Sequence, residues 1–178
     1  ASCSFHFYIG LNYENYILAV LSCVKIHNII KLLQGFKKLK KDNDTNIRFV
    51  IVLQILDNEY FDEIQKFVSN NFNNGEIIFF QNLENKYLIN LYRNAKFYIF
   101  SSYCEVFGLT SLEAMSQGCP VLISNRSALP EINSDAAYYF DPDKENEIKD
   151  CMYKVLNDNS YRDEIKKRAN DHYKKFNW

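Results

Sequence analysis

Short apolar runs alternating with amphipathic stretches constrain the fold of this chain most. Residues 48–54 (RFVIVLQ) form a continuous apolar run, typical of a strand that is buried on both faces of a sheet. Similar runs predict strands at residues 16–22, 76–80, 96–101, 120–124 and 136–140. Apolar residues at helical spacing lie between them and predict helices at residues 29–39, 60–69, 85–94, 110–117, 148–156 and 161–175.

This alternation of strands and helices favours an α/β fold with a Rossmann-like, doubly wound parallel sheet. In such folds, ligands bind beyond the carboxyl ends of the strands. The 178 residues suit a single domain, and 47% of them are hydrophobic, enough for a sizeable core. A turn is expected at Leu129-Pro130, between the last two strands.

Charge and cysteine usage limit the classes of ligand and partner, and the cellular location, that we expect for the chain. The chain has 21 basic and 22 acidic residues and a formal net charge of -1, so we expect no nucleic-acid partner. Five cysteines form no C-x-x-C pair, and three histidines are scattered, so neither a disulfide framework nor a metal site is indicated. Together with the lack of an apolar run long enough to cross a bilayer, this favours a cytoplasmic location.

The segment SSYCEVFGLTSLEA, residues 101–114, places a strand end, a carboxylate, a lone glycine and a helix start in succession. Thr110 and Glu113 have the spacing of a capping box, which predicts Thr110 as the helix cap. Gly108 lets the backbone amides of Phe107, Gly108 and Leu109 approach an anion at the positive end of this helix. A diphosphate is the natural ligand, and nearby carboxylates suit sugar hydroxyls.

Glu105 and Glu113 bracket seven residues, an E-x7-E spacing. The surrounding run EVFGLTSLEAMSQGCPVLISNRSALPEI, followed by DAAYYFDP, extends this pattern in register over residues 105–142. In these motifs, and more weakly over about its whole length, the chain resembles glycosyltransferase family 4 and its retaining GT-B relatives. The resemblance implies that residues 1–178 form one C-terminal-type donor-binding domain, which is one half of a GT-B fold.

The resemblance also implies roles for individual residues. Glu105 is expected to contact the hydroxyls of the donor sugar, as the candidate catalytic residue, and Glu113 to accept hydrogen bonds from the nucleotide ribose. Phe107 is expected to border the donor, and Gly108, Leu109 and Thr110 to hold its phosphates. The expected donor is a UDP-, GDP- or other nucleoside-diphosphate sugar. No cofactor or metal is expected, because backbone amides, a helix dipole and usually basic side chains neutralise the leaving diphosphate in such enzymes.

Some positions depart from the family pattern. Where relatives carry Gly-Arg at the end of the first strand and a Lys a few residues later, this chain has Leu21, Ser22 and His27. Asn28 fits the pattern, and Lys25 is a candidate to replace a missing base. Ser22, Lys25 and His27 are therefore further candidate donor-binding residues.

Two hypotheses remain open. In the first, the chain is a fragment of a glycosyltransferase: it lacks an initiator Met and an N-terminal acceptor domain, and it ends at Phe176-Asn177-Trp178, where relatives begin their final helices. The complete enzyme is expected to transfer a sugar to a glycan or lipid-linked acceptor and to reach membranes only peripherally, through the missing domain, whereas the fragment alone is expected to be inactive. In the second hypothesis, the chain is a non-catalytic Rossmann-like module with a degenerate donor site. Leu53 and Gln81, which replace family glycines, favour this alternative together with Ser22 and His27.

Overall fold

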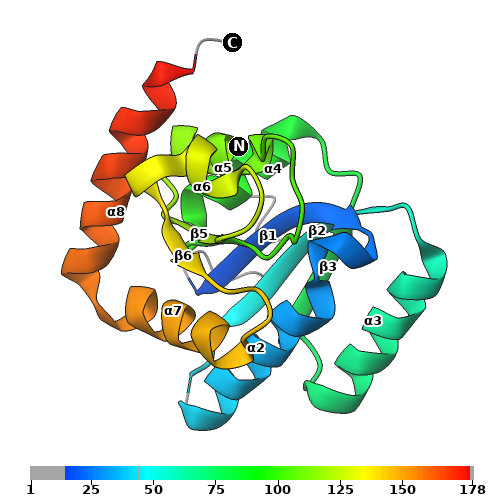
Figure 1. Ribbon diagram of the computed structural model, residues 1–178. Helices are drawn as coiled ribbons and strands as arrows, with labels where there is room; N and C mark the ends of the chain where they lie inside the picture. Colours follow the sequence, from blue (N-terminus) through cyan, green and yellow to red (C-terminus); the bar gives the residue numbers. More distant parts are fainter. Residues whose placement is uncertain (1–14, 44, 177–178) are drawn as a thin grey trace.

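The computed structural model, which describes residues 15–43 and 45–176, contains a single six-stranded parallel sheet (Figure 1). Its strand order is β3-β2-β1-β4-β5-β6. This is the order of doubly wound, Rossmann-like sheets, and it confirms the predicted fold class. The strands are β1 (Tyr16–Cys23), β2 (Arg48–Ile55), β3 (Ile77–Gln81), β4 (Tyr98–Phe100), β5 (Val121–Ser124) and β6 (Tyr138–Phe140).

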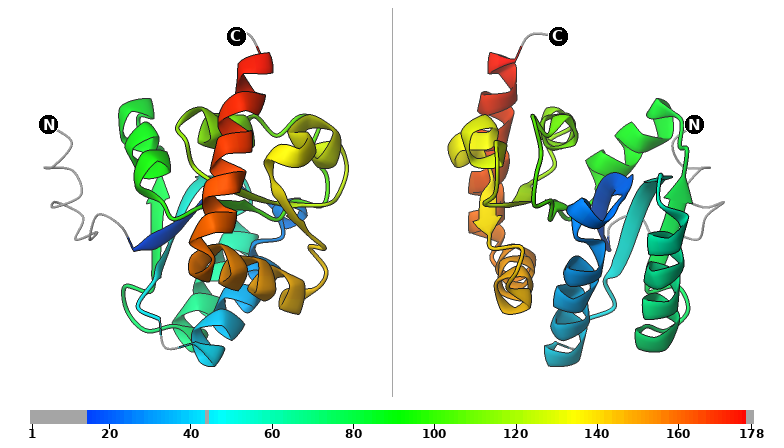
Figure 2. Two further views of the ribbon diagram at one scale, coloured as in Figure 1. Left: turned by 90° about the vertical axis from the view of Figure 1, so that its left-hand side faces the viewer. Right: turned by 45° about the vertical axis from the view of Figure 1, so that its right-hand side comes forward.

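Helices cover both faces of the sheet. In Figure 1, α2 (Ile29–Asp42), α3 (Asn58–Asn71) and α7 (Glu145–Asn157) lie below the sheet, and α4 (Asn85–Asn94) and α5 (Leu109–Ser116) lie above it. α8 (Asn159–His172) runs along the β6 side and contacts both α7 and α5 (Figure 2). The shorter elements are α6 (Leu129–Asn133) and three 3-10 turns, η1 (Lys25–His27), η2 (Ser134–Ala136) and η3 (Tyr173–Lys175).

The two central strands show why the sheet is parallel and covered on both faces. In β2, the residues from Phe49 to Leu53 are all buried, as the continuous apolar run predicted. In β1, Ile17, Leu18 and Ala19 have no exposed surface, and the strand pairs with β2 on one side and β4 on the other. None of the helices in the described part of the chain has the length and apolar character needed to cross a bilayer.

Two of the sequence predictions about turns and strand ends were wrong. The expected turn at Leu129-Pro130 is the first turn of α6, where proline is tolerated because its missing N–H would have no helical partner. β4 is shorter than its apolar run, because only Tyr98–Phe100 keep the strand geometry. Ser101 leaves the strand and its hydroxyl donates to the carbonyl of His27 at 2.9 Å, which ties the end of β4 to η1.

Close packing of α2 against α7 depends on a glycine. A Cβ atom on Gly35 of α2 would lie 2.5 Å from Cγ2 and 2.8 Å from Cβ of Ile148 in α7. Both contacts are shorter than side-chain atoms tolerate, and Ile148 is fully buried. Glu145 of α7 adds ion pairs of 2.9 Å with Lys31 and with Lys38 of α2. The two helices are therefore held at a separation that only glycine permits.

We predict that Gly35→Ala lowers the free energy of unfolding by about 1–3 kcal/mol, because the added methyl group overpacks the contact with Ile148. Urea denaturation followed by circular dichroism measures this difference. Lys41→Ala is the matched control, since Lys41 is exposed on the same helix, and it should change stability by less than about 0.5 kcal/mol. Equal stability of the Gly35→Ala variant and the wild type would show that the helices separate without cost.

Candidate functional site

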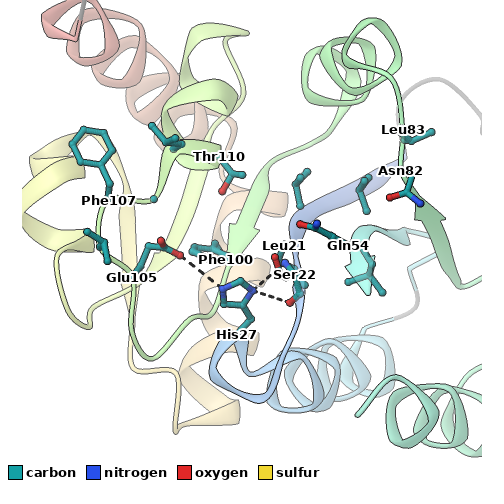
Figure 3. A pocket seen from close by; sticks show the side chains of 16 residues that line it. Leu21, Ser22, His27, Gln54, Asn82, Leu83, Phe100, Glu105, Phe107 and Thr110 are labelled. Carbon is teal, nitrogen blue, oxygen red and sulfur yellow. Dashed lines mark hydrogen bonds and ion pairs between the residues drawn. The ribbon is translucent and has the colours of Figure 1, made fainter. Parts of the chain in front are cut away.

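A cavity of about 610 Å³ opens at the carboxyl edge of the sheet, between the ends of β1, β2 and β4 (Figure 3). The strand order reverses between β1 and β4, so the cavity lies at the switch point of the sheet. The parallel register brings the strand ends to one level, because Ser22 pairs with Gln54 and Leu53 with Gln81. The lining residues are Val20, Leu21, Ser22, His27, Val52, Leu53, Gln54, Asn82, Leu83, Phe100, Glu105, Val106, Phe107, Gly108, Leu109 and Thr110.

One wall of the cavity is the start of α5. Gly108 precedes the helix with a φ of 80°, in the left-handed region that glycine adopts readily. A Cβ atom there would lie 2.7 Å from Cδ2 of Leu129, so the loop and α6 approach each other closely. The first-turn amides of Leu109 and Thr110 have no partner within the helix and carry the positive end of its dipole. The sequence therefore builds a wall here whose free amides have the geometry to donate hydrogen bonds to an anion.

The predicted capping box is wrong. Thr110 is the second residue of α5 and makes no cap, because Gly108 occupies the cap position. The Thr110 hydroxyl instead lies 2.7 Å from the hydroxyl of Tyr98 in β4. This contact uses the threonine to join α5 to the sheet, and it points Thr110 at the cavity rather than at its own helix (Figure 3).

Glu113 lies one helical turn beyond Thr110 and is exposed. Its Oε2 accepts a hydrogen bond of 3.2 Å from the hydroxyl of Tyr92 in α4. Glu113 does not line the main cavity; it lines a neighbouring recess between α5 and the C-terminal segment, with Tyr173 and Phe176. Of the residues predicted from the E-x7-E spacing, the structure therefore places Glu105 in the cavity and Glu113 beside it.

Glu105 faces His27 across the cavity (Figure 3). The distance from Glu105 Oε2 to His27 Nε2 is 3.8 Å, and the two side chains are 26% and 14% exposed. The other ring nitrogen, His27 Nδ1, lies 2.8 Å from the carbonyl oxygen of Ser22. The ring also meets Phe100 edge-on, at 5.3 Å between centroids. His27 is thus fixed on three sides, with one nitrogen turned toward Glu105.

Burial lowers the pKa of His27, although the Ser22 carbonyl and the Glu105 carboxylate oppose this shift. The lining residues of the cavity include neither lysine nor arginine. Lys25 is not among them; its side chain is 68% exposed, and its Nζ lies 3.6 Å from Oε1 of Glu63 in α3. The structure therefore brings Ser22 and His27 into the candidate site and leaves Lys25 outside it.

Several lining residues were missed by the sequence analysis. Gln54, Asn82 and Leu83 form the wall at the ends of β2 and β3. Asn82 has a φ of 51°, a conformation that asparagine adopts more often than most residues. An asparagine directly after a strand was therefore an available signal. Among the described residues, no group of three histidine, cysteine or acidic side chains is placed to hold a metal ion.

Comparisons with known proteins identify relatives of the chain. Residues 9–172 match the family described as glycosyl transferases group 1. The O-antigen chain mannosyltransferase B of Escherichia coli is 30% identical over 168 residues, which cover 94% of this chain and 44% of that protein. The O-antigen chain mannosyltransferase RfbU of Salmonella typhimurium is 28% identical, and the match covers 80% of this chain and 38% of the relative. The chain thus spans less than half the length of these two curated relatives.

Solved structures show the same fold. The sucrose-phosphate synthase of Thermosynechococcus elongatus superposes with a TM-score of 0.84 at 21% identity, over 97% of this chain and 44% of that one. The C-terminal domain of a group 1 glycosyl transferase (LpcC) from Francisella tularensis gives 0.82 at 19% identity, over 95% of this chain and 89% of that one. With the family match over most of its length, the chain belongs to the group 1 glycosyl transferases and has the Rossmann-like fold of a GT-B domain.

Proposed function

We propose that this domain binds a nucleoside-diphosphate sugar in the cavity between β1 and β4, and that the complete enzyme transfers the sugar to a glycan or lipid-linked acceptor. A mannosyl donor is favoured, because the two curated relatives named above are mannosyltransferases. The observation that carries the proposal is the start of α5, where unpartnered amides after Gly108 open into a cavity at the switch point of the sheet.

Along this wall, the geometry supports separate binding positions for the diphosphate and the sugar of the donor. The diphosphate would accept hydrogen bonds from the amides of Leu109 and Thr110, and the helix dipole would favour its negative charge. These donors are fixed before the reaction, so they would also stabilise the charge that builds up on the departing diphosphate. Glu105, at the near end of the wall, would accept hydrogen bonds from the hydroxyls of the sugar.

The nucleoside half of the donor would extend toward Glu113 or toward the ends of β2 and β3. Glu113 is the family candidate for the ribose hydroxyls, and its hydrogen bond from Tyr92 leaves carboxylate lone pairs for a second partner. Phe107 and Leu109 supply apolar surface beside the donor. Retention of anomeric configuration is proposed from the family resemblance, and the acceptor would be held by a domain outside this chain.

A non-catalytic module with a degenerate donor site is the second candidate. The observation that favours it is the absence of lysine and arginine from the lining of the cavity. A charge-assisted hydrogen bond to phosphate contributes about 1.5–3 kcal/mol, so a site without one binds its donor more weakly. Failure of a folded domain to bind any nucleotide sugar would favour this candidate.

A test of the donor site compares variants of Glu105 and Glu113. Titration calorimetry of the domain with UDP, GDP and their sugar conjugates should detect one preferred nucleotide. Glu105→Gln should weaken binding of the sugar conjugate about 10-fold or more and should change binding of the free nucleotide much less, because the hydroxyls that Glu105 would bind belong to the sugar. Glu113→Gln should weaken both, through the ribose. Glu164→Gln, on α8 in a surface ion pair with Arg168, is the matched control; a loss of affinity in this variant equal to that in the other two would remove the assignment.

A further prediction compares two glycines that have the same left-handed backbone conformation. Gly108 has a φ of 80° and Gly75 a φ of 82°, but a Cβ atom on Gly75 would have no neighbour within 4 Å. Alanine at either position should cost about 1 kcal/mol of stability because of the positive φ. Gly108→Ala should cost about 1–3 kcal/mol more, through the contact with Leu129, and should abolish donor binding.

Thermal unfolding and calorimetry on the same samples separate these effects. Gly75→Ala should lose stability and keep the wild-type affinity for the donor. Unchanged donor affinity in a folded Gly108→Ala variant would contradict the placement of the phosphates at the start of α5.

A further inference from the structure

The charge balance of the cavity is unusual for a site that takes an anionic ligand. Of the sixteen lining residues, only Glu105 and His27 have side chains that titrate. When His27 is neutral, the lining therefore carries only the negative charge of Glu105. The helix dipole of α5 offsets this in part, since its positive end amounts to about half an elementary charge. A diphosphate needs more positive charge than that.

The groups around His27 offer an acceptor to each ring nitrogen. Nδ1 lies 2.8 Å from the Ser22 carbonyl oxygen, to which an N–H would donate, and 3.1 Å from the Ser22 amide nitrogen, whose N–H would donate to a lone pair, so either tautomer of the neutral ring fits. Nε2 is the nitrogen that faces Glu105. This nitrogen lies 3.8 Å from a carboxylate oxygen of Glu105. A lone pair facing a carboxylate is unfavourable, whereas an N–H there would join two anions, the carboxylate and a bound phosphate. Figure 3 shows the ring between β1 and the loop that carries Glu105.

No other charged group in the described surroundings takes this role. β4 contributes the Phe100 ring, β1 contributes the main chain of Ser22, and the loop after β4 contributes Glu105. On η1 itself, Lys25 is paired with Glu63 of α3. Burial lowers the pKa of His27 below its usual value near 6.5, which favours the neutral ring before the donor binds.

We propose that His27 takes up a proton as the diphosphate of the donor binds, so that the site gains its cation from the solvent instead of from a fixed lysine or arginine. The inference rests on the proposed function and goes beyond it, because it makes donor binding dependent on pH. With the added proton both ring nitrogens are donors, Nδ1 to the Ser22 carbonyl and Nε2 toward Glu105 and the diphosphate. No covalent bond to the ligand forms, and the proton returns to solvent when the diphosphate leaves.

The sign of the dependence follows from linkage. A bound diphosphate raises the pKa of His27, so the complex holds more protons than the free domain. Affinity therefore increases as pH falls through the pKa of the complex, by at most about tenfold per pH unit for one proton, and levels off below the pKa of the free domain. The phosphates of a sugar nucleotide are diesters that stay ionised throughout this range, so they contribute no proton of their own.

Titration calorimetry with GDP-mannose and UDP-glucose, at roughly pH 6 and pH 8, measures the affinity of the domain for each donor. Repeating the titrations in buffers of different ionisation enthalpy measures the number of protons taken up on binding. For the wild type we expect net proton uptake on binding and several-fold tighter binding at the lower pH. His27→Gln should bind weakly at both pH values without proton uptake. His27→Lys should bind without proton uptake and, at the higher pH, more tightly than the wild type, because its charge is permanent.

The variants also provide their own controls. His172, the other histidine among the described residues, donates from Nε2 to the carbonyl oxygen of Ile132 at 2.7 Å and is present in every variant. Proton uptake that persists in His27→Gln would overturn the inference, as would wild-type binding that does not change with pH. If His27→Lys binds a donor and the wild type does not, the cavity is still the donor site, but the proposed proton uptake by His27 is wrong. Absence of binding in every folded variant would overturn the proposed function itself.

Discussion

Burial of β1 on both faces and along both edges is the constraint on which the rest of the structure depends. Ile17, Leu18 and Ala19 are inaccessible to solvent, and the strand pairs with β2 and with β4. A strand in this position forces the chain to add strands outward in both directions, with crossover helices on opposite faces. The crossovers that leave β1 and β4 diverge, and the cavity lies where they separate. The site is thus a consequence of topology before any functional side chain is considered.

The side chains then give the cavity its chemical character. Gly108 allows α5 to begin at the cavity wall and α6 to approach through Leu129, which brings the first-turn amides of α5 to the cavity. The Tyr98–Thr110 and Tyr92–Glu113 hydrogen bonds tie α5 to β4 and α4, so these polar groups are oriented by the core. Against this polar wall, the ends of β1 and β2 present Leu21 and Leu53. One wall suits phosphate and sugar, and the opposite side supplies apolar contact.

The alternation of apolar runs and helical stripes predicted the parallel sheet and the edge at which the cavity opens, because those depend on patterns spread over many residues. Local geometry was harder to predict. The capping box at Thr110 failed because tertiary contact with Tyr98 competed for the same hydroxyl. The turn at Leu129-Pro130 failed because proline also fits the first turn of a helix.

The ion pair of Lys25 with α3, and the His27–Glu105 contact, join segments far apart in sequence. Spacing alone carries no information about such pairs. The motif did predict which segment forms the cavity wall: Glu105, Phe107, Gly108, Leu109 and Thr110 all line it. It did not predict that Glu113 lies outside the lining, because that depends on how far α5 is rotated against α4.

Backbone amide chemical shifts of the domain, titrated with GDP-mannose and UDP-glucose, test the central claim most directly. If the diphosphate binds at the start of α5, we expect saturable shifts that are largest at the amides of Gly108, Leu109 and Thr110, with smaller ones near His27 and Asn82. Absence of saturable shifts with either donor, or largest shifts at a surface away from the carboxyl edge of the sheet, would contradict the claim that this cavity binds the donor.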